Sequence, residues 1–136
     1  MRSIGHIISD IKSEYGELGG LKAKRLGDVR NNMKLGRKLS CDEKVFLKIY
    51  AMDLYEKAIE IEEERDEFHR ALTNCKTKEE ARRIQVAKSM ELQAETKNKG
   101  DLEFVTTRMM RMMSILGEYS DFAKSKEYEK LPKGYG

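Results

Sequence analysis

Residues 102–123 read LEFVTTRMMRMMSILGEYSDFA, and this stretch decides the fold class of the chain. Its apolar residues recur at alternating intervals of three and four, at Leu102, Val105, Met109, Met112, Leu116, Tyr119 and Ala123. This spacing keeps an apolar seam in line along one side of an α-helix, as a heptad repeat does. We therefore predict a helix over 102–123 that forms the protein core through the seam from Leu102 to Tyr119.

A second apolar stripe lies outside that seam and consists of Phe104, Ile115 and Phe122, and Met110 also points away from the seam. A helix with two apolar faces has more surface to bury than one neighbouring helix can cover. Methionine side chains are adaptable, which suits both irregular cores and binding surfaces. We therefore expect these four residues to bind a partner, either another subunit or the N-terminal helix.

The starts of three further helices are indicated by capping residues. A cap followed three positions later by glutamate is typical of a helix N-terminus, and it occurs at Ser40–Glu43, Asp53–Glu56 and Thr77–Glu80. These caps predict helices near 41–52, 54–73 and 78–97. Helices of this length joined by short loops pack most simply as an up-down-up antiparallel arrangement.

We thus expect an all-α protein with an antiparallel three-helix bundle over about residues 41–123. The alternative is a long hairpin that completes its core only by pairing with a second copy. In the helix over 54–73, Arg65 interrupts an apolar seam that runs from Leu54 to Leu72. We expect its stem to pack and its guanidinium to reach a carboxylate or the bundle surface, so that Arg65→Leu leaves the stability equal or better.

The first 39 residues are expected to form a looser helical arm with a basic linker. An apolar pattern from Ile4 to Leu18 predicts a first helix, which Gly19 and Gly20 are expected to end. A short helix is expected over 26–35, with Gly36 as its C-terminal stop. The organisation is then a 1–39 arm, a 40–123 bundle and a flexible 124–136 tail.

Composition supports helices and limits the cellular setting. The 136 residues include one proline and no tryptophan, and 38% are charged, which favours long helices over strands. No run of about 18 apolar residues occurs, so we expect no membrane partner. The N-terminus lacks a signal-peptide pattern, so we expect a cytoplasmic protein in which Cys41 and Cys75 are reduced.

No residue pattern is typical of an enzyme or of a cofactor site. Asp66 and His69 have a spacing that metal ligands use, but a second such pair is missing. Cys41 opens a helix with no histidine near it in sequence, and no phosphate-binding glycine motif is present. We therefore expect no catalytic residue, no cofactor and no metal, and a solvent-facing His69.

A basic segment precedes the first strong helix cap, with Asp28 as its one acidic residue between positions 20 and 39. It contains Lys22, Lys24, Arg25, Arg30, Lys34, Arg37 and Lys38. The order of helix, tight turn and capped helix over 26–52 has the layout of a helix-turn-helix, although Asp42 and Glu43 would face the DNA phosphates.

Two functions remain from these patterns. The first is a non-enzymatic helical protein–protein interaction module that self-associates through the extra apolar stripe. The alternative is a nucleic-acid-binding accessory protein that uses the basic 22–38 segment.

Overall fold

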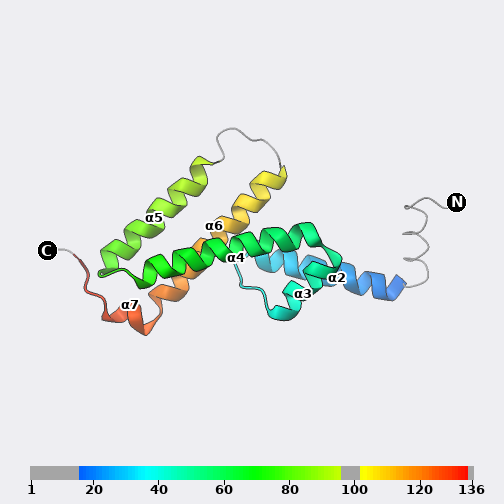
Figure 1. Cartoon of the computed structure of the whole chain (residues 1–136), viewed down its shortest axis with the longest axis horizontal. Helices are drawn as coiled ribbons and strands as arrows, with labels where there is room; N and C mark the ends of the chain where they lie inside the picture. The colour runs from blue at the N-terminus through cyan, green and yellow to red at the C-terminus, as the bar shows by residue number, and fades with distance from the viewer. Residues whose placement is uncertain (1–15, 96–101, 135–136) are drawn as a thin grey trace. The chain divides into compact units, whose positions relative to one another are not determined.

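The computed structural model describes residues 16–95 and 102–134, and their regular structure is entirely helical (Figure 1). The helices are α2 (Gly16–Lys34), α3 (Cys41–Tyr50), α4 (Met52–Thr73), α5 (Lys78–Ala94), α6 (Leu102–Ala123) and α7 (Lys126–Lys130). The expected all-α class is confirmed. Across the described ranges, none of the helices combines the length and apolar content needed to cross a membrane.

The chain divides into two compact units, Met1–Asn31 and Asn32–Gly136. The described part of the first unit is α2, which passes through Gly19, Gly20 and Gly27 without a break. The helix end expected at Gly19 and Gly20 is therefore wrong. Each glycine costs a helix only about 1 kcal/mol relative to alanine, and a 19-residue helix tolerates that cost. The apolar pattern from residue 4 to residue 15 lies outside the described residues.

The second unit opens with the C-terminal cap of α2, and the stop expected at Gly36 is confirmed. Gly36 has a φ of +74°, which is the left-handed conformation that glycine adopts without strain. The amide of Gly36 donates to the carbonyl of Met33 at 3.1 Å, and the amide of Arg37 donates to that of Asn32 at 2.9 Å. This pair of bonds is the Schellman motif, which satisfies two carbonyls that the helix end leaves open.

The predicted caps at Ser40 and Thr77 are both present. Glu43 donates its amide to Ser40 Oγ at 3.1 Å and accepts from the Ser40 amide at 3.0 Å, which completes a capping box. Thr77 Oγ1 accepts from the amide of Glu80 at 3.0 Å. The cap predicted at Asp53 is wrong, because α4 begins at Met52, two residues earlier than expected, and its N-cap, Ala51, makes no side-chain bond.

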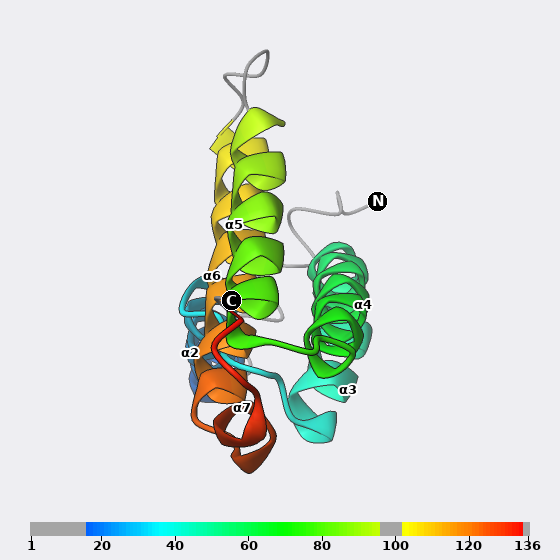
Figure 2. The ribbon, with the colours of Figure 1, turned by 90° about the vertical axis from the view of Figure 1, so that its left-hand side faces the viewer.

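The core of the second unit is organised around α6. Helices α4, α5 and α7 all pack on α6, and α3 packs on α4. Helices α5 and α6 form an antiparallel hairpin, and α4 crosses α6 obliquely (Figures 1 and 2). One buried cluster joins the three long helices and consists of Phe68, Leu72, Cys75, Ala81, Leu92, Ile115 and Phe122. The expected three-helix core is thus approximate, because α4 and α5 meet mainly through α6.

The described residues after α6 pack against the helices, and the expected flexibility of the 124–136 tail stays a prediction. Ser125 caps α7, and Tyr128 packs edge-on against Phe122 with ring centroids 5.8 Å apart. The carbonyls of Pro132 and Lys133 accept from the first amides of α5 at 2.8 and 3.0 Å. Those amides have no partner within their own helix, so the tail satisfies donors that would otherwise need water.

Candidate interaction surface

The structure buries most of the α6 stripe that was expected to bind a partner, and it exposes part of the stripe that was expected to form the core. The residues predicted to form the core seam include Leu102, Met109 and Leu116, which are 79%, 48% and 42% exposed. Val105 is half-buried, and Met112 and Tyr119 pack only at the edge of the core. The prediction of a core seam from Leu102 to Tyr119 is therefore wrong for Leu102, Met109 and Leu116, whereas Met112 and Tyr119 do contact the core.

The residues predicted to bind a partner lie instead in the core. Met110, Ile115 and Phe122 are buried within the chain, and Phe104 is half-buried. These side chains are already covered, so the first three are not available to another molecule. Helix α6 does have two apolar faces, as expected, but the face that was expected to bind a partner is the more buried one.

The oblique crossing of α4 explains which face is buried. The buried positions Met110, Ser114, Glu118 and Phe122 are spaced by four residues along α6. Such a row forms a ridge inclined to the helix axis, and ridges of this kind pack where helices cross at about 50° rather than about 20°. The heptad pattern implied a nearly parallel neighbour, which this face does not have.

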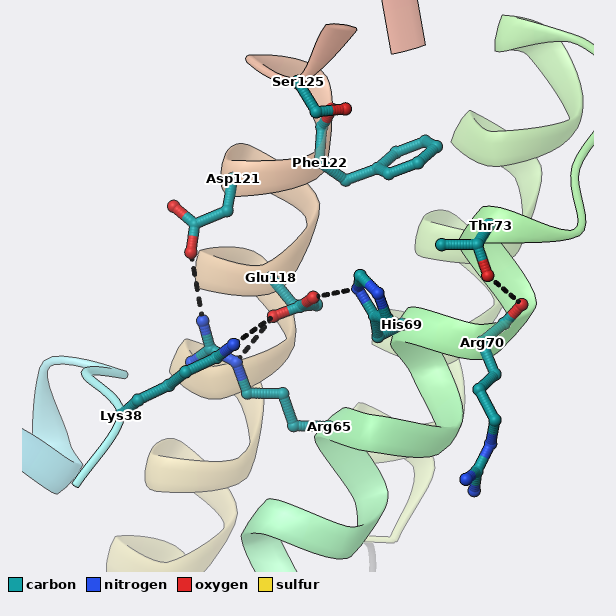
Figure 3. Close-up of polar contacts among 9 residues, drawn as sticks. All are labelled: Lys38, Arg65, His69, Arg70, Thr73, Glu118, Asp121, Phe122 and Ser125. Carbon is teal, nitrogen blue, oxygen red and sulfur yellow. Dashed lines mark hydrogen bonds and ion pairs between the residues drawn. The ribbon is translucent and has the colours of Figure 1, made fainter. Parts of the chain in front are cut away.

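The polar junction between α4 and α6 consists of Lys38, Arg65, His69, Glu118 and Asp121 (Figure 3). Arg65 Nε donates to Glu118 Oε2 at 2.8 Å, and Arg65 NH2 donates to Asp121 Oδ2 at 3.3 Å. His69 Nδ1 lies 2.5 Å from Glu118 Oε1. The side chains of Arg65 and Glu118 are 6% and 4% exposed, so the junction is centred on a buried ion pair.

The loop before α3 is fixed to this junction. Arg65 NH1 donates to the carbonyl of Gly36 at 2.6 Å, and Lys38 Nζ lies 3.8 Å from Glu118 Oε2. A Cβ atom at Gly36 would lie 2.2 Å from the carbonyl oxygen of Met113, and one at Gly117 would lie 3.1 Å from the Gly36 oxygen. The loop therefore rests directly on the backbone of α6.

Only part of this junction is predictable from the sequence. The guanidinium of Arg65 reaches a carboxylate, as expected, but it is buried between two helices rather than at a surface. His69 is about half exposed. The expectation that it faces solvent holds for only part of the ring, because Nδ1 contacts Glu118. Glu118 was missed, because an isolated glutamate in an apolar helix gives no sign of which partner it has.

Burial on its own would raise the pKa of Glu118, but hydrogen bonds from Arg65 and His69 together with the charges of Lys38 and Arg65 lower it by more. The net pKa lies below its ordinary value of 4.5. Burial likewise acts to raise the pKa of Glu64, and hydrogen bonds from Arg111 and Lys88 bring the net value down. Both carboxylates are therefore more acidic in the folded protein than in the unfolded chain.

This direction predicts an acid-sensitive stability. A carboxyl group with a lowered folded pKa stabilises the fold above its unfolded pKa, and this contribution is lost as the pH falls through the folded pKa. The urea midpoint should thus be nearly constant from about pH 7 to pH 5.5 and decrease below about pH 4.5. In Glu118→Gln the decrease should be shallower. An equally steep decrease in that variant would show that Glu118 does not contribute.

A second ion-pair group joins the three long helices. Arg111 of α6 donates to the two oxygens of Glu64 of α4 at 3.0 and 2.8 Å, and it also binds Glu95 beyond the end of α5. Lys88 of α5 lies 3.1 Å from Glu64. The hydrogen bond from Arg111 to Glu64 is the largest of the effects that raise the pKa of Arg111. Neither ion-pair group includes a residue of the exposed face of α6.

The basic residues of the 22–38 segment do not form one stripe along α2. At about 100° per residue, the basic residues of α2 are spread around the whole helix, namely Lys22, Lys24, Arg25, Arg30 and Lys34. Lys24, Arg25, Arg30 and Lys34 are exposed. Beyond the helix, Arg37 NH1 donates to Asn32 Oδ1 at 3.4 Å. Nucleic-acid binding by this segment stays a prediction.

The fold and the open face of α6 define the chain as an all-α helical protein with an exposed, heptad-spaced apolar stripe. No known protein family, curated protein or solved structure matches it. Within the described ranges, no three histidine, cysteine, aspartate or glutamate side chains are grouped so that they could hold a metal ion.

Proposed function

We propose that the chain is a non-enzymatic helical interaction module that self-associates through the exposed seam of α6. The exposed seam is defined here as Leu102, Met109 and Leu116. The observation that carries the proposal is the exposure of Leu102, Met109 and Leu116, three large apolar side chains at seven-residue intervals. A seven-residue repeat is the spacing by which one helix packs along another.

A second copy of the chain fits this seam better than a charged partner does. The residues four positions after Leu102, Met109 and Leu116 are Thr106, Met113 and Ser120, and none carries a charge. These positions flank the seam in a coiled-coil pairing, where charges set the choice of partner. On this side of the seam two copies can therefore approach without repulsion between like charges, and the apolar seam gains cover. Of positions 108, 115 and 122, which flank the other side, only Arg108 carries a charge.

The polar junction supports a structural role rather than a catalytic one. The carboxylate that orients His69 is itself bound by Arg65 at 2.8 Å and is almost fully buried. His69 is also the only histidine within the described residues. The arrangement stabilises a helix crossing, and no nucleophile is brought to the imidazole by an observed contact.

The test compares two sets of serine substitutions by sedimentation equilibrium. The seam variant is Leu102→Ser with Met109→Ser and Leu116→Ser. The control is Val86→Ser with Met90→Ser, which removes apolar side chains that are 43% and 63% exposed on α5. We expect the wild type and the control to be dimers and the seam variant to be a monomer with an unchanged helical circular dichroism spectrum.

Two results would contradict this proposal. A wild type that stays monomeric at about 100 μM, a concentration at which even a micromolar dimer is well populated, would remove self-association. Equal loss of the dimer in both variants would show that the seam is not the interface. Tight duplex DNA binding by a monomer would support the nucleic-acid alternative, and about six phosphate contacts would give a slope near −5 in log affinity against log salt.

A further inference from the structure

A cavity of about 240 Å³ lies where the loop after α2 meets α4 and α6. Its apolar wall includes Met33, Leu39 and Ile61, and the buried side chains of Arg65 and Ser114 also line it. Binding sites for small molecules combine apolar walls with a few placed polar groups in this way. The volume is below the range of about 300–1,000 Å³ for drug-sized ligands, so a ligand here must be small.

The charges around the cavity favour an anion. Of the two acidic side chains that line it, Glu62 is bound by Lys44 at 2.8 Å, and Asp66 is exposed. Four basic side chains line it, namely Arg37, Lys38, Lys44 and Arg65. Lys44 is paired with Glu62, and Arg65 is paired with Glu118 and Asp121. The basic groups left to attract a negative ligand are therefore Arg37 and Lys38.

Two of these basic side chains, Arg37 and Lys38, line the cavity and are also exposed to solvent. Arg37 is exposed, and its hydrogen-bond partner is the neutral amide of Asn32 at 3.4 Å. The side chain of Lys38 is 67% exposed and lies 3.8 Å from Glu118, which Arg65 already binds at 2.8 Å. Both cations can therefore turn to a ligand without leaving a buried carboxylate unpaired.

Arg65 lines the cavity but is already hydrogen-bonded within the chain. Its three nitrogens donate to Glu118, Gly36 and Asp121, and its side chain is 6% exposed. The charged group of a ligand is therefore left to Arg37 and Lys38.

We propose that this cavity binds a small anionic amphiphile, a carboxylate on a short aliphatic chain. The wall formed by Met33, Leu39 and Ile61 covers the chain, and Arg37 and Lys38 bind the carboxylate. An inorganic anion would leave the apolar wall uncovered, and an aliphatic amine would meet the basic groups. This site is separate from the exposed seam of α6, so it can be present or absent whatever the oligomeric state.

Three probes separate the contributions of charge and chain, each followed by heteronuclear NMR shifts and calorimetry on the full chain. Octanoate should bind with saturable shifts at residues around the cavity. Octylamine, with the same chain length and the opposite charge, should bind at least about tenfold more weakly. Inorganic phosphate should give no saturable shift at the same residues.

Matched variants locate the site. Arg37→Glu with Lys38→Glu should weaken octanoate binding by at least about tenfold, whereas Lys24→Glu with Arg30→Glu, an equal change of charge, should not. Ala58→Leu, which fills the cavity, should also abolish binding. Equal binding of octanoate and octylamine, unchanged affinity in the Arg37/Lys38 variant, or no octanoate binding at about 10 mM would each overturn the proposal.

Discussion

Arg65→Leu should lower the free energy of unfolding by about 3–5 kcal/mol, measured by urea denaturation at pH 7. The substitution leaves Glu118 buried without the guanidinium that lies 2.8 Å from it. It also removes the donor to the Gly36 carbonyl at 2.6 Å. The sequence alone suggested that this change would be neutral or better, because a charged residue in an apolar seam reads as a defect. The buried partner reverses that expectation.

Two controls isolate the cost of the unpaired carboxylate. Arg65→Leu with Glu118→Leu removes both charges, and it should recover most of the loss, because a buried ion pair is often replaceable by apolar side chains. Lys57→Leu breaks an ion pair with Glu103, whose side chain is 68% exposed, and it should cost less than about 1 kcal/mol. A loss below about 1 kcal/mol for Arg65→Leu alone would show that Glu118 finds another partner or water.

The helices and most of their ends were predictable because their signals are local. Ser40 with Glu43, Thr77 with Glu80, and Gly36 each satisfy backbone groups within a few residues of themselves. Such contacts depend little on the rest of the molecule. The end predicted at Gly19 and Gly20 was wrong because it depended on helix propensity alone. Propensity is a weak preference, and the rest of a long helix outweighs it.

The buried face of α6 was not predictable, because it is chosen by a neighbour that is distant in sequence. Both stripes of this helix are apolar, so hydrophobic pattern alone does not distinguish them. The face that meets α4 contains Ser114 and Glu118, and a pattern based on hydrophobicity counts both as surface positions. Two signals were available in the sequence. Gly117 permits a close approach of the backbone, and Arg65, within the apolar seam of α4, offers a charge opposite to that of Glu118.

Because the buried face of α6 differs from the one expected, the property that a substitution tests, folding or self-association, also differs. Phe122→Ser would now remove a side chain from the buried cluster, so it would test folding rather than association. Leu116→Ser changes a side chain that is 42% exposed and leaves that cluster intact. A loss of self-association is therefore informative only when the substituted residues belong to the exposed seam.

Gly36→Ala should be strongly destabilising, by about 3 kcal/mol or more, because strain and steric overlap add at this position. The residue has a φ of +74°, and a Cβ atom would lie 2.2 Å from the carbonyl oxygen of Met113. Met113 O belongs to the backbone of α6, so it cannot turn aside as a flexible side chain could. The loop would have to lift from α6, which would break the 2.6 Å bond from Arg65 to the Gly36 carbonyl.

Two other glycines provide a graded comparison by the same urea measurement. Gly27→Ala should stabilise the protein by about 0.5–1 kcal/mol, because nothing lies within 4 Å of the added Cβ and alanine favours the helix. Gly117→Ala should fall between the two, since its Cβ would lie 3.1 Å from the Gly36 oxygen and the loop must yield only slightly. Because Gly36→Ala and Arg65→Leu disturb the same contact, their combined loss should be smaller than the sum of the separate losses. A strictly additive pair would show that the loop is held to α6 independently of Arg65.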